Sequence, residues 1–357
     1  MRKLLTICAL ALVALVPATA GAATPPPIKH VWVIALENKG YTTTFGPGSA
    51  APYLAQTLTS QGELLTQYYG IGHASLDNYI ALVSGQAPNP VTQGDCPFYE
   101  DFLPGTPAPS NGQVIGQGCV YPTSVKTIAD QLQTAGLSWR GYMEDMTSNC
   151  LHPALNSQDT TQQARPGDQY AARHNPFVYF HSIIDSPSCA ANDVPLTQLS
   201  TDLQAATTTP SFSFITPNLC HDGHDSPCVD GEPGGLTSAN QFLQTWVPQI
   251  LASPAYAAGG LVIVTFDEAD TSDASACCDE QPGFNTPNPG GPTPGPGGGR
   301  VGAVLLSQYV TPGSTSNHGY NHYSLLRSVE DIFGLAHLGY AGQTDLKPFG
   351  HDVYTGP

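Results

Sequence analysis

The sequence has few basic side chains. It contains 11 lysines and arginines against 28 aspartates and glutamates in 357 residues, a formal net charge of −17 at pH 7. Such an acidic surface repels phosphate groups, so nucleic-acid backbones and anionic membrane surfaces are poor partners for the general surface of the protein. If the chain handles a phosphate group, positive charge has to be supplied locally, and a bound metal ion is the obvious source.

The sequence also lacks an apolar run long enough to span a membrane, so we expect no transmembrane segment. The N-terminal run over residues 4–16 is too short for that purpose, and it lies between two basic residues and a series of small residues. This arrangement is typical of a secretory signal peptide, with cleavage after Ala20 or Ala22. We therefore expect residues 1–23 to be a signal peptide and residues 24–357 to be secreted, to the periplasm or the extracellular space.

Cysteine, by contrast, is well represented. One of the nine cysteines lies in the expected signal peptide, which leaves eight. An even number in an exported protein favours disulfides, up to four here, and the sequence does not determine their pairing. Cys277 and Cys278 are adjacent, so we expect them to bond to different partners. Cys220 and Cys228 enclose a histidine-rich loop that a local disulfide could close.

Short apolar strands alternate with amphipathic helices along the chain. Continuous apolar runs predict strands buried on both faces, and a period of 3.6 residues predicts helices. The expected strands are 31–36, 137–142, 212–216, 261–266 and 301–307, and the expected helices are 52–60, 76–84, 125–135, 242–250 and 322–333. This alternation is typical of an α/β fold with a mainly parallel central sheet and helices on both faces.

The 37 glycines and 33 prolines imply long loops on this scaffold. Residues 86–123 read as a loop stapled by a disulfide, and residues 147–195 are polar and irregular. Residues 270–300 are rich in glycine and proline and should form an exposed loop. Since neither repeats nor a second domain boundary are visible, we expect a single domain over residues 24–357.

A polar stretch that ends at Ser75 leads directly into an apolar helical pattern. Leu76, Ile80 and Val83 share one helical face, and Gly85 is a natural stop. Ser75 therefore lies at or next to the N-cap, where unpaired N–H groups and the helix dipole favour an anionic oxygen such as phosphate. A nucleophile and an anion site would then coincide, although a serine that only caps the helix fits the same stretch.

Side chains able to bind metal follow the predicted strands or begin the predicted helices. Glu37-Asn38 and Asp267-Glu268 each end a buried strand. The carboxyl ends of parallel strands share one edge of a sheet, so these residues can converge on one pocket. The same positions hold His221, Asp222, His224, His318 and His322. Two alternatives remain open, namely that Glu37 caps a turn and that the histidines near residue 221 are ordinary loop residues beside a disulfide.

The identity of such a metal stays open. Carboxylate and amide ligands suit Mg²⁺, Mn²⁺ or Ca²⁺, whereas histidines favour Zn²⁺ or Fe. A metal beside Ser75 would lower the pKa of the hydroxyl, and Asn78, one turn further on, could donate to phosphoryl oxygens. A phosphoserine intermediate hydrolysed by water would follow.

His322, at a helix N-terminus, should be neutral, as a metal ligand must be. Four further residues are weaker candidates for the site, because only their residue type and their neighbours in the sequence support them: His73, Glu144, Arg173 and His174.

Taken in order, these motifs resemble the bacterial and fungal phosphoesterase family, which includes secreted acid phosphatases and phospholipases C. That family belongs to the alkaline phosphatase-like superfamily, so the resemblance implies an alkaline phosphatase-like fold. The resemblance covers residues 28–335. It is carried by Glu37-Asn38 after an apolar strand, Ser75-Leu76-Asp77-Asn78-Tyr79 before a helix, Phe266-Asp267-Glu268, and His322-Tyr323-Ser324-Leu325-Leu326-Arg327 with Glu330-Asp331.

The resemblance implies a role for each matching residue. The expected metal ligands are Glu37, Asn38, Ser75, Asp267 and Glu268. The expected catalytic residues are the nucleophile Ser75, the phosphate contact Asn78, and the histidines His224 and His322. Further metal or phosphate contacts are expected among His221, Asp222, His318 and His174.

The chain also departs from the pattern of that superfamily. Two-metal members place a histidine four residues after an aspartate, where this chain has Ser226 after Asp222, and they use Asp-His where it has Asp267-Glu268. We therefore expect one divalent metal ion, which could be Mg, Ca, Mn, Zn or Fe. The sulfatase branch is disfavoured because the sequence lacks a Cys-x-Pro-x-Arg stretch.

These expectations describe a secreted, metal-dependent phosphoesterase of the acid phosphatase type. It would hydrolyse small phosphate monoesters through a phosphoserine on Ser75. A phospholipase C or other phosphodiesterase, acting on a phospholipid headgroup, is the alternative within enzymes. A catalytically silent cell-surface binding protein on the same fold is the alternative outside them.

Overall fold

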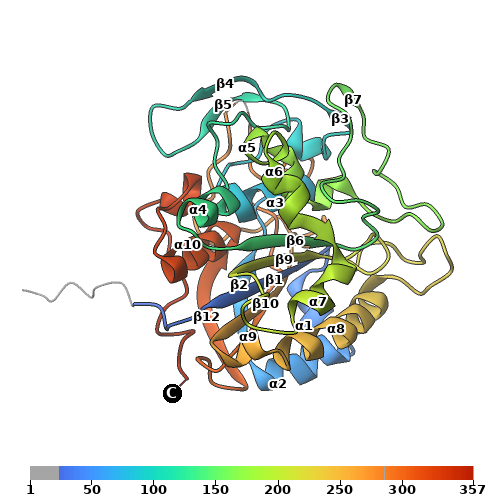
Figure 1. Ribbon diagram of the computed structural model, residues 1–357, viewed down its shortest axis with the longest axis vertical. Helices are drawn as coiled ribbons and strands as arrows, with labels where there is room; N and C mark the ends of the chain where they lie inside the picture. Colours follow the sequence, from blue (N-terminus) through green and yellow to red (C-terminus); the bar gives the residue numbers. More distant parts are fainter. Residues whose placement is uncertain (1–23, 285, 357) are drawn as a thin grey trace, which may run out of the picture.

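An eight-stranded sheet runs through the centre of the computed structural model, which describes residues 24–284 and 286–356 (Figure 1). The expected signal peptide, residues 1–23, lies outside the described residues. In spatial order the strands are β12 (Ser314–Asn321), β2 (Glu63–Tyr69), β11 (Ala303–Ser307), β10 (Gly260–Phe266), β1 (His30–Leu36), β9 (Phe212–Thr216), β6 (Trp139–Met143) and β8 (Asp193–Pro195).

The sheet is mainly parallel. β10, β1, β9, β6 and β8 pair in parallel, as do β2 and β12, and β11 lies antiparallel between β10 and β2. Every residue of β1 and β10 is buried, which explains their continuous apolar sequences. Leu36 pairs with Phe266 at the end of these two strands, so the residues that follow each strand leave the sheet side by side.

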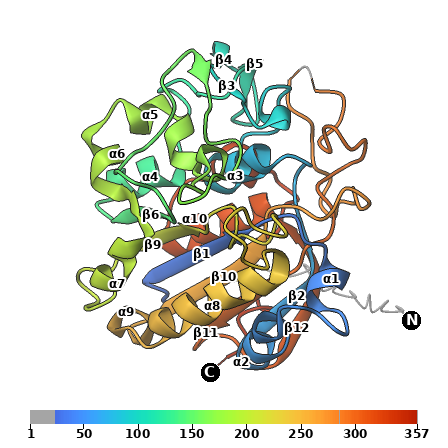
Figure 2. The same ribbon diagram turned by 90° about the vertical axis from the view of Figure 1, so that its right-hand side faces the viewer.

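Helices cover both faces of the sheet, as predicted (Figures 1 and 2). One face carries α3 (Ser75–Ser84), α4 (Ile128–Thr134) and α10 (His322–Phe333), which pack against one another. The other carries α8 (Gly235–Leu251), α9 (Pro254–Ala257), a π-helix (Tyr53–Leu58), α2 (Thr59–Gln61) and α1 (Tyr41–Phe45). None of the described helices combines the length and the apolar composition needed to cross a membrane.

The long loops contain more structure than their sequences indicate. Residues 86–123 include β3 (Phe98–Tyr99) and an antiparallel pair, β4 (Leu103–Pro107) with β5 (Val114–Gln117). Residues 147–195 include β7 (Ser157–Gln158), α5 (His181–Ile184) and α6 (Pro187–Asn192), and α7 (Leu199–Asp202) follows. Both segments are joined by disulfides as expected, and the short elements within them have no periodicity that a sequence could reveal.

Disulfides join all eight cysteines of the described residues in four pairs. Cys96–Cys119 closes the 86–123 segment, Cys150–Cys189 joins residues of the next irregular segment, and Cys220–Cys228 forms the expected local bridge. The expectation that Cys277 and Cys278 reach different partners is wrong, since they bond to each other. The other six cysteines are already paired, which leaves these neighbours no alternative.

Helix α3 is held at its C-terminus by a close backbone contact. Gly85 ends the helix with a φ of 67°, and a Cβ atom there would lie 2.3 Å from the carbonyl oxygen of Leu338. Gly136, after α4, has a similar φ of 74° but nothing within 4 Å of the same position. Alanine substitutions at these two positions can therefore distinguish the cost of backbone strain from the cost of a steric overlap.

We predict that Gly136→Ala lowers the free energy of unfolding by about 1 kcal/mol, from the left-handed backbone alone. Gly85→Ala should lower it by about 2–4 kcal/mol, because its methyl group also overlaps the Leu338 carbonyl. Urea unfolding followed by circular dichroism measures both values. Equal losses in the two variants would show that the contact with residue 338 is not restrictive.

Candidate active site

The paired ends of β1 and β10 bring two carboxylates together at one edge of the sheet. Glu37 and Asp267 are almost fully buried there, at 1% and 0% exposure. The backbone N–H of Asn38 donates to the Asp267 carboxylate at 3.0 Å, and the Asn38 side-chain amide donates to Glu268. Asn38 has a positive φ of 50°, a backbone turn that folds the end of β1 onto the end of β10.

Ser75 lies against this pair from the start of α3. Its hydroxyl donates to Glu37 Oε2 at 2.7 Å. The N-cap residue is Ala74, and Ser75 occupies the first helical position without capping the helix. The alternative of a serine that only caps the helix is therefore not what the structure shows.

Asn78 has less freedom than expected. Its side-chain oxygen accepts hydrogen bonds from the N–H groups of Ile71, at 2.7 Å, and Gly72, at 3.2 Å. Its amide donates to the carbonyl oxygens of Gly72 and Ala74, and lies 3.4 Å from Glu268 Oε2. The side chain thus fixes the loop before α3, and in this arrangement its donors are directed to protein oxygens rather than left free for phosphate.

His174 is more central than its sequence context indicated. It lies in a 3₁₀ turn (Ala172–His174), with Nε2 3.4 Å from Glu37 Oε1 and Nδ1 3.5 Å from Asp222 Oδ2. The ring of Tyr79 stacks on it at 5.3 Å between centroids. Burial, with smaller contributions from Arg173 and His224, lowers the pKa of His174 well below its usual value, so the ring is neutral.

Asp222 and His224 join the cluster from the loop after β9. The carbonyl oxygen of Asp222 accepts from Glu37 N at 2.8 Å, and its carboxylate accepts from His224 N at 2.8 Å. The His224 ring is half exposed and contacts Asp225 at 2.8 Å, and this hydrogen bond is the main reason that the pKa of His224 is raised. His224 is therefore the titratable group of the cluster that faces solvent.

His322 lies beneath the cluster and supports it. Nε2 is 2.6 Å from the Asp267 carbonyl oxygen, and Nδ1 is 3.0 Å from the Tyr68 hydroxyl. Burial lowers the pKa of His322 to about 4, which agrees with the neutral ring expected at a helix N-terminus. Both ring nitrogens have protein partners, so this histidine orients the end of β10 in this structure rather than facing the carboxylates.

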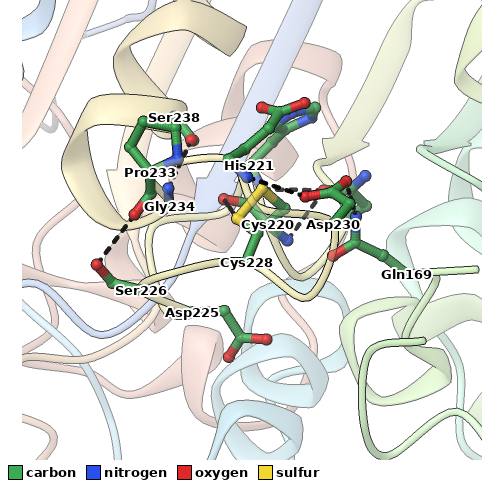
Figure 3. Close-up of a disulfide and its surroundings, with 12 residues drawn as sticks. Gln169, Cys220, His221, Asp225, Ser226, Cys228, Asp230, Pro233, Gly234 and Ser238 are labelled. Carbon is green, nitrogen blue, oxygen red and sulfur yellow. Dashed lines mark hydrogen bonds and ion pairs between the residues drawn. A yellow bond between two sulfur atoms is a disulfide. The ribbon is translucent and has the colours of Figure 1, made fainter. Parts of the chain in front are cut away.

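Two candidate histidines lie outside the cluster. His221 contacts Glu144 at 2.9 Å and Glu232 at 3.3 Å beside the Cys220–Cys228 disulfide (Figure 3). The hydrogen bond with Glu144 is the main cause that raises its pKa to about 9. His318 is exposed on the edge strand β12, 3.5 Å from Asp352. The structure does not bring either ring to Glu37.

The cluster contains four buried carboxyl groups. Burial is the largest cause that raises the pKa values of Glu37, Asp222, Asp267 and Glu268, and repulsion between these groups adds to it in the last three. One oxygen of each of three carboxylates has no hydrogen-bond partner within the described residues: Glu37 Oε1, Asp222 Oδ2 and Asp267 Oδ2. Buried anionic oxygens without partners are costly, and a bound cation would satisfy them.

Sulfur ligands are not available for such a cation. Within the described residues, three groups of ligand atoms lie within 4.8 Å of one another, and each includes at least one disulfide-bonded cysteine. The Glu37 and Asp267 carboxylates are not among these groups. The cluster's potential ligand atoms are its unpartnered carboxylate oxygens, which are hard ligands, and the neutral imidazole of His174.

Comparison with known proteins gives consistent results. The model of the Phosphoesterase family matches residues 48–336. A phosphate-repressible acid phosphatase of Penicillium chrysogenum is 28% identical over 313 residues, 87% of this chain and 59% of that protein. A phosphatidylinositol-3-phosphatase of Mycobacterium tuberculosis is 25% identical over 316 residues, 88% of this chain and 80% of that protein. The chain thus spans about three fifths of the fungal relative's length.

Solved structures share the fold at low identity. A protein of the alkaline phosphatase superfamily from Vibrio parahaemolyticus aligns with a TM-score of 0.53 at 13% identity, over 93% of this chain and 73% of that one. A putative sulfatase from Bacteroides thetaiotaomicron gives 0.53 at 10% identity, over 93% and 75%. These matches confirm the alkaline phosphatase-like fold.

The isolation of His221 from the cluster leads to a pH prediction. With a pKa of about 9 in the folded protein and about 6.5 when unfolded, the charged ring stabilises the fold below pH 6.5 and loses this effect as the pH rises through 9. His221→Gln should therefore cost about 1 kcal/mol at pH 6, allowing for solvent screening of a partly exposed pair, and much less at pH 10.

Urea unfolding at the two pH values measures this difference. The matched control is His351→Gln, since His351 is exposed near the C-terminal end of the described residues. A loss that is the same at pH 6 and pH 10 would contradict the assignment of the stabilising effect to the charged ring.

Proposed function

Since the chain belongs to the Phosphoesterase family, we propose that it is a secreted, metal-dependent phosphomonoesterase of the acid phosphatase type, with Ser75 as its nucleophile. The observation that carries this proposal is the 2.7 Å hydrogen bond from the Ser75 hydroxyl to the buried Glu37 carboxylate at the start of α3. The relatives named acid phosphatase support the reaction class.

Nucleophilic attack would begin from this hydrogen bond. The Ser75 oxygen would attack phosphorus and form a phosphoserine, while the bond from phosphorus to the alcohol oxygen breaks. Glu37 Oε2 is positioned to accept the serine proton, because it already accepts the hydrogen bond. The amino end of α3 faces the same point, and its dipole favours the negative phosphoryl oxygens.

A proton has to reach the alcohol oxygen as it leaves. His224 is suited to this task, since its pKa is raised by Asp225 and its ring is half exposed at the edge of the cluster. Water would then attack the phosphoserine, release inorganic phosphate and restore the Ser75 hydroxyl. His174 would stay neutral, and its single N–H would face either the Glu37 or the Asp222 carboxylate.

One divalent cation would complete the site. The residues that would hold it are Glu37, Asn38, Ser75, Asp267 and Glu268. When bound, it would neutralise phosphoryl oxygens and lower the pKa of the serine hydroxyl. The unpaired oxygens of Glu37 and Asp267 support this assignment, and the oxygen-rich ligand set favours Mg²⁺, Mn²⁺ or Ca²⁺ over Zn²⁺ or Fe.

We predict that Ser75→Ala lowers kcat for p-nitrophenyl phosphate by at least about a thousandfold, because the phosphoserine cannot form. Ser84→Ala, at the other end of α3, removes a buried hydroxyl that donates only to the helix backbone, and it should retain activity. An inactive wild-type protein across acid, neutral and alkaline pH would favour the binding-protein alternative. Hydrolysis of diesters with little monoesterase activity would favour the phosphodiesterase.

We also predict that a chelator abolishes the activity of the wild-type protein and that a divalent cation restores it. Metal analysis of the purified protein should find about one ion per chain. The Asp267→Asn variant should need a higher metal concentration for the same activity, because one anionic ligand becomes neutral. Full activity in a chelated, metal-free sample would remove the cation from the proposal.

A further inference from the structure

A polar groove opens beside the carboxylate cluster. It has a volume of about 420 Å³ and is lined by two tyrosines, four serines or threonines, two aspartates, one arginine and one glycine. No aliphatic side chain is among the described residues that line it. Such a lining offers hydrogen-bond donors and acceptors in place of the apolar surface that a hydrocarbon chain needs.

The groove is lined by residues of the loops that follow β1 and β10, the same two loops that carry the carboxylates. Gly40 and Asp270 line it, and each lies two residues beyond a member of the cluster. The buried ring of His73 packs between the two regions, with Nδ1 3.9 Å from Glu268 Oε2 and Nε2 3.0 Å from the carbonyl oxygen of Asp273. An alcohol esterified to a phosphate at the cluster would therefore lie next to this groove.

Arg300 is the cation of the groove. Its guanidinium group lies 4.0 Å from the centroid of the Tyr41 ring, which fixes its position. It forms no ion pair with a carboxylate in the part of the chain that the structure describes, although Asp270 and Asp273 line the same groove. Its N–H groups are therefore available to a ligand, which matters in a chain with so few basic residues.

The two aspartates limit the charge of that ligand. Asp270 accepts hydrogen bonds from the backbone and side chain of Ser272, and Asp273 accepts from the N–H groups of Ser275 and Arg300. Two carboxylates and one guanidinium leave the groove with a net negative charge. A second phosphate is disfavoured there, whereas neutral hydroxyl groups can donate to carboxylates and accept from the guanidinium.

We propose that this groove binds the alcohol part of the substrate, and that this alcohol is neutral and rich in hydroxyl groups, as in a sugar phosphate or a cyclitol phosphate. The inference rests on the proposed function and narrows its substrate class. Arg300 and Asp270 would contact the hydroxyl groups directly and so determine specificity, whereas Ser75 carries out the chemistry on any monoester.

The test compares three esters of aliphatic alcohols with the full secreted chain. Hexyl phosphate, glucose 6-phosphate and myo-inositol 1-phosphate have alkyl leaving groups of similar reactivity, so differences in kcat/KM report on binding of the alcohol. We expect the wild-type protein to prefer one or both hydroxyl-rich esters to hexyl phosphate by about tenfold or more. The preferred ester distinguishes a sugar from a cyclitol. Equal or greater activity on hexyl phosphate would overturn the inference.

Two variants assign the preference to the groove. Arg300→Gln and Asp270→Asn should each reduce the ratio of kcat/KM for the preferred ester to that for hexyl phosphate by about tenfold, as expected for losing one charge-assisted hydrogen bond. Lys126→Ala, which removes an exposed lysine beside α4, should leave the ratio unchanged. Equal losses on all three esters would mean that the groove residues are structural. Absence of hydrolysis of every ester by the wild-type protein would instead refute the proposed function, and this inference with it.

Discussion

The parallel pairing of β1 with β10 is the constraint on which the candidate active site depends. The two strands are in register up to their last residues, so Glu37 and Asp267 leave the sheet together. Neither carboxylate can move away, since both follow fully buried strands and are held by backbone hydrogen bonds. α3 then adds Ser75 to a fixed acidic position, and its hydroxyl meets Glu37 at 2.7 Å.

This arrangement collects four buried carboxylates next to the half-exposed ring of His224. Beyond burial, the Glu37 carboxylate raises the pKa values of Asp222, Asp267 and Glu268, and Asp267 adds to that of Glu268. Such a cluster is costly for the fold and useful for a ligand of opposite charge. Burial also lowers the pKa values of His174 and His322. Both rings are therefore neutral, and they pack beside the carboxylates without adding charge to the cluster.

The sequence indicated the parts of the site that local patterns control. Apolar runs ending in acids located Glu37 and Asp267, and a helix start located Ser75. Long-range packing determined the rest. His174 gave no such pattern, because its 3₁₀ turn is placed by contacts such as that of the neighbouring Asn175 with Asp193 on β8. For Asn78 and His322 the residue types were informative, but a sequence does not reveal that their polar atoms already have hydrogen-bond partners within the protein. Edge strand β12 was missed because its residues are largely polar.

The disulfides have an unequal effect on the chain. Three of them close segments of 8, 23 and 39 residues in sequence separation, which restricts the unfolded ensemble, whereas the bond between the adjacent Cys277 and Cys278 closes no segment at all. None of the eight bonded cysteines lies in a strand of the central sheet. Oxidation therefore restricts the segments that cover the sheet, and it anchors them to the core, since the bonded Cys96, Cys119 and Cys189 are themselves core residues.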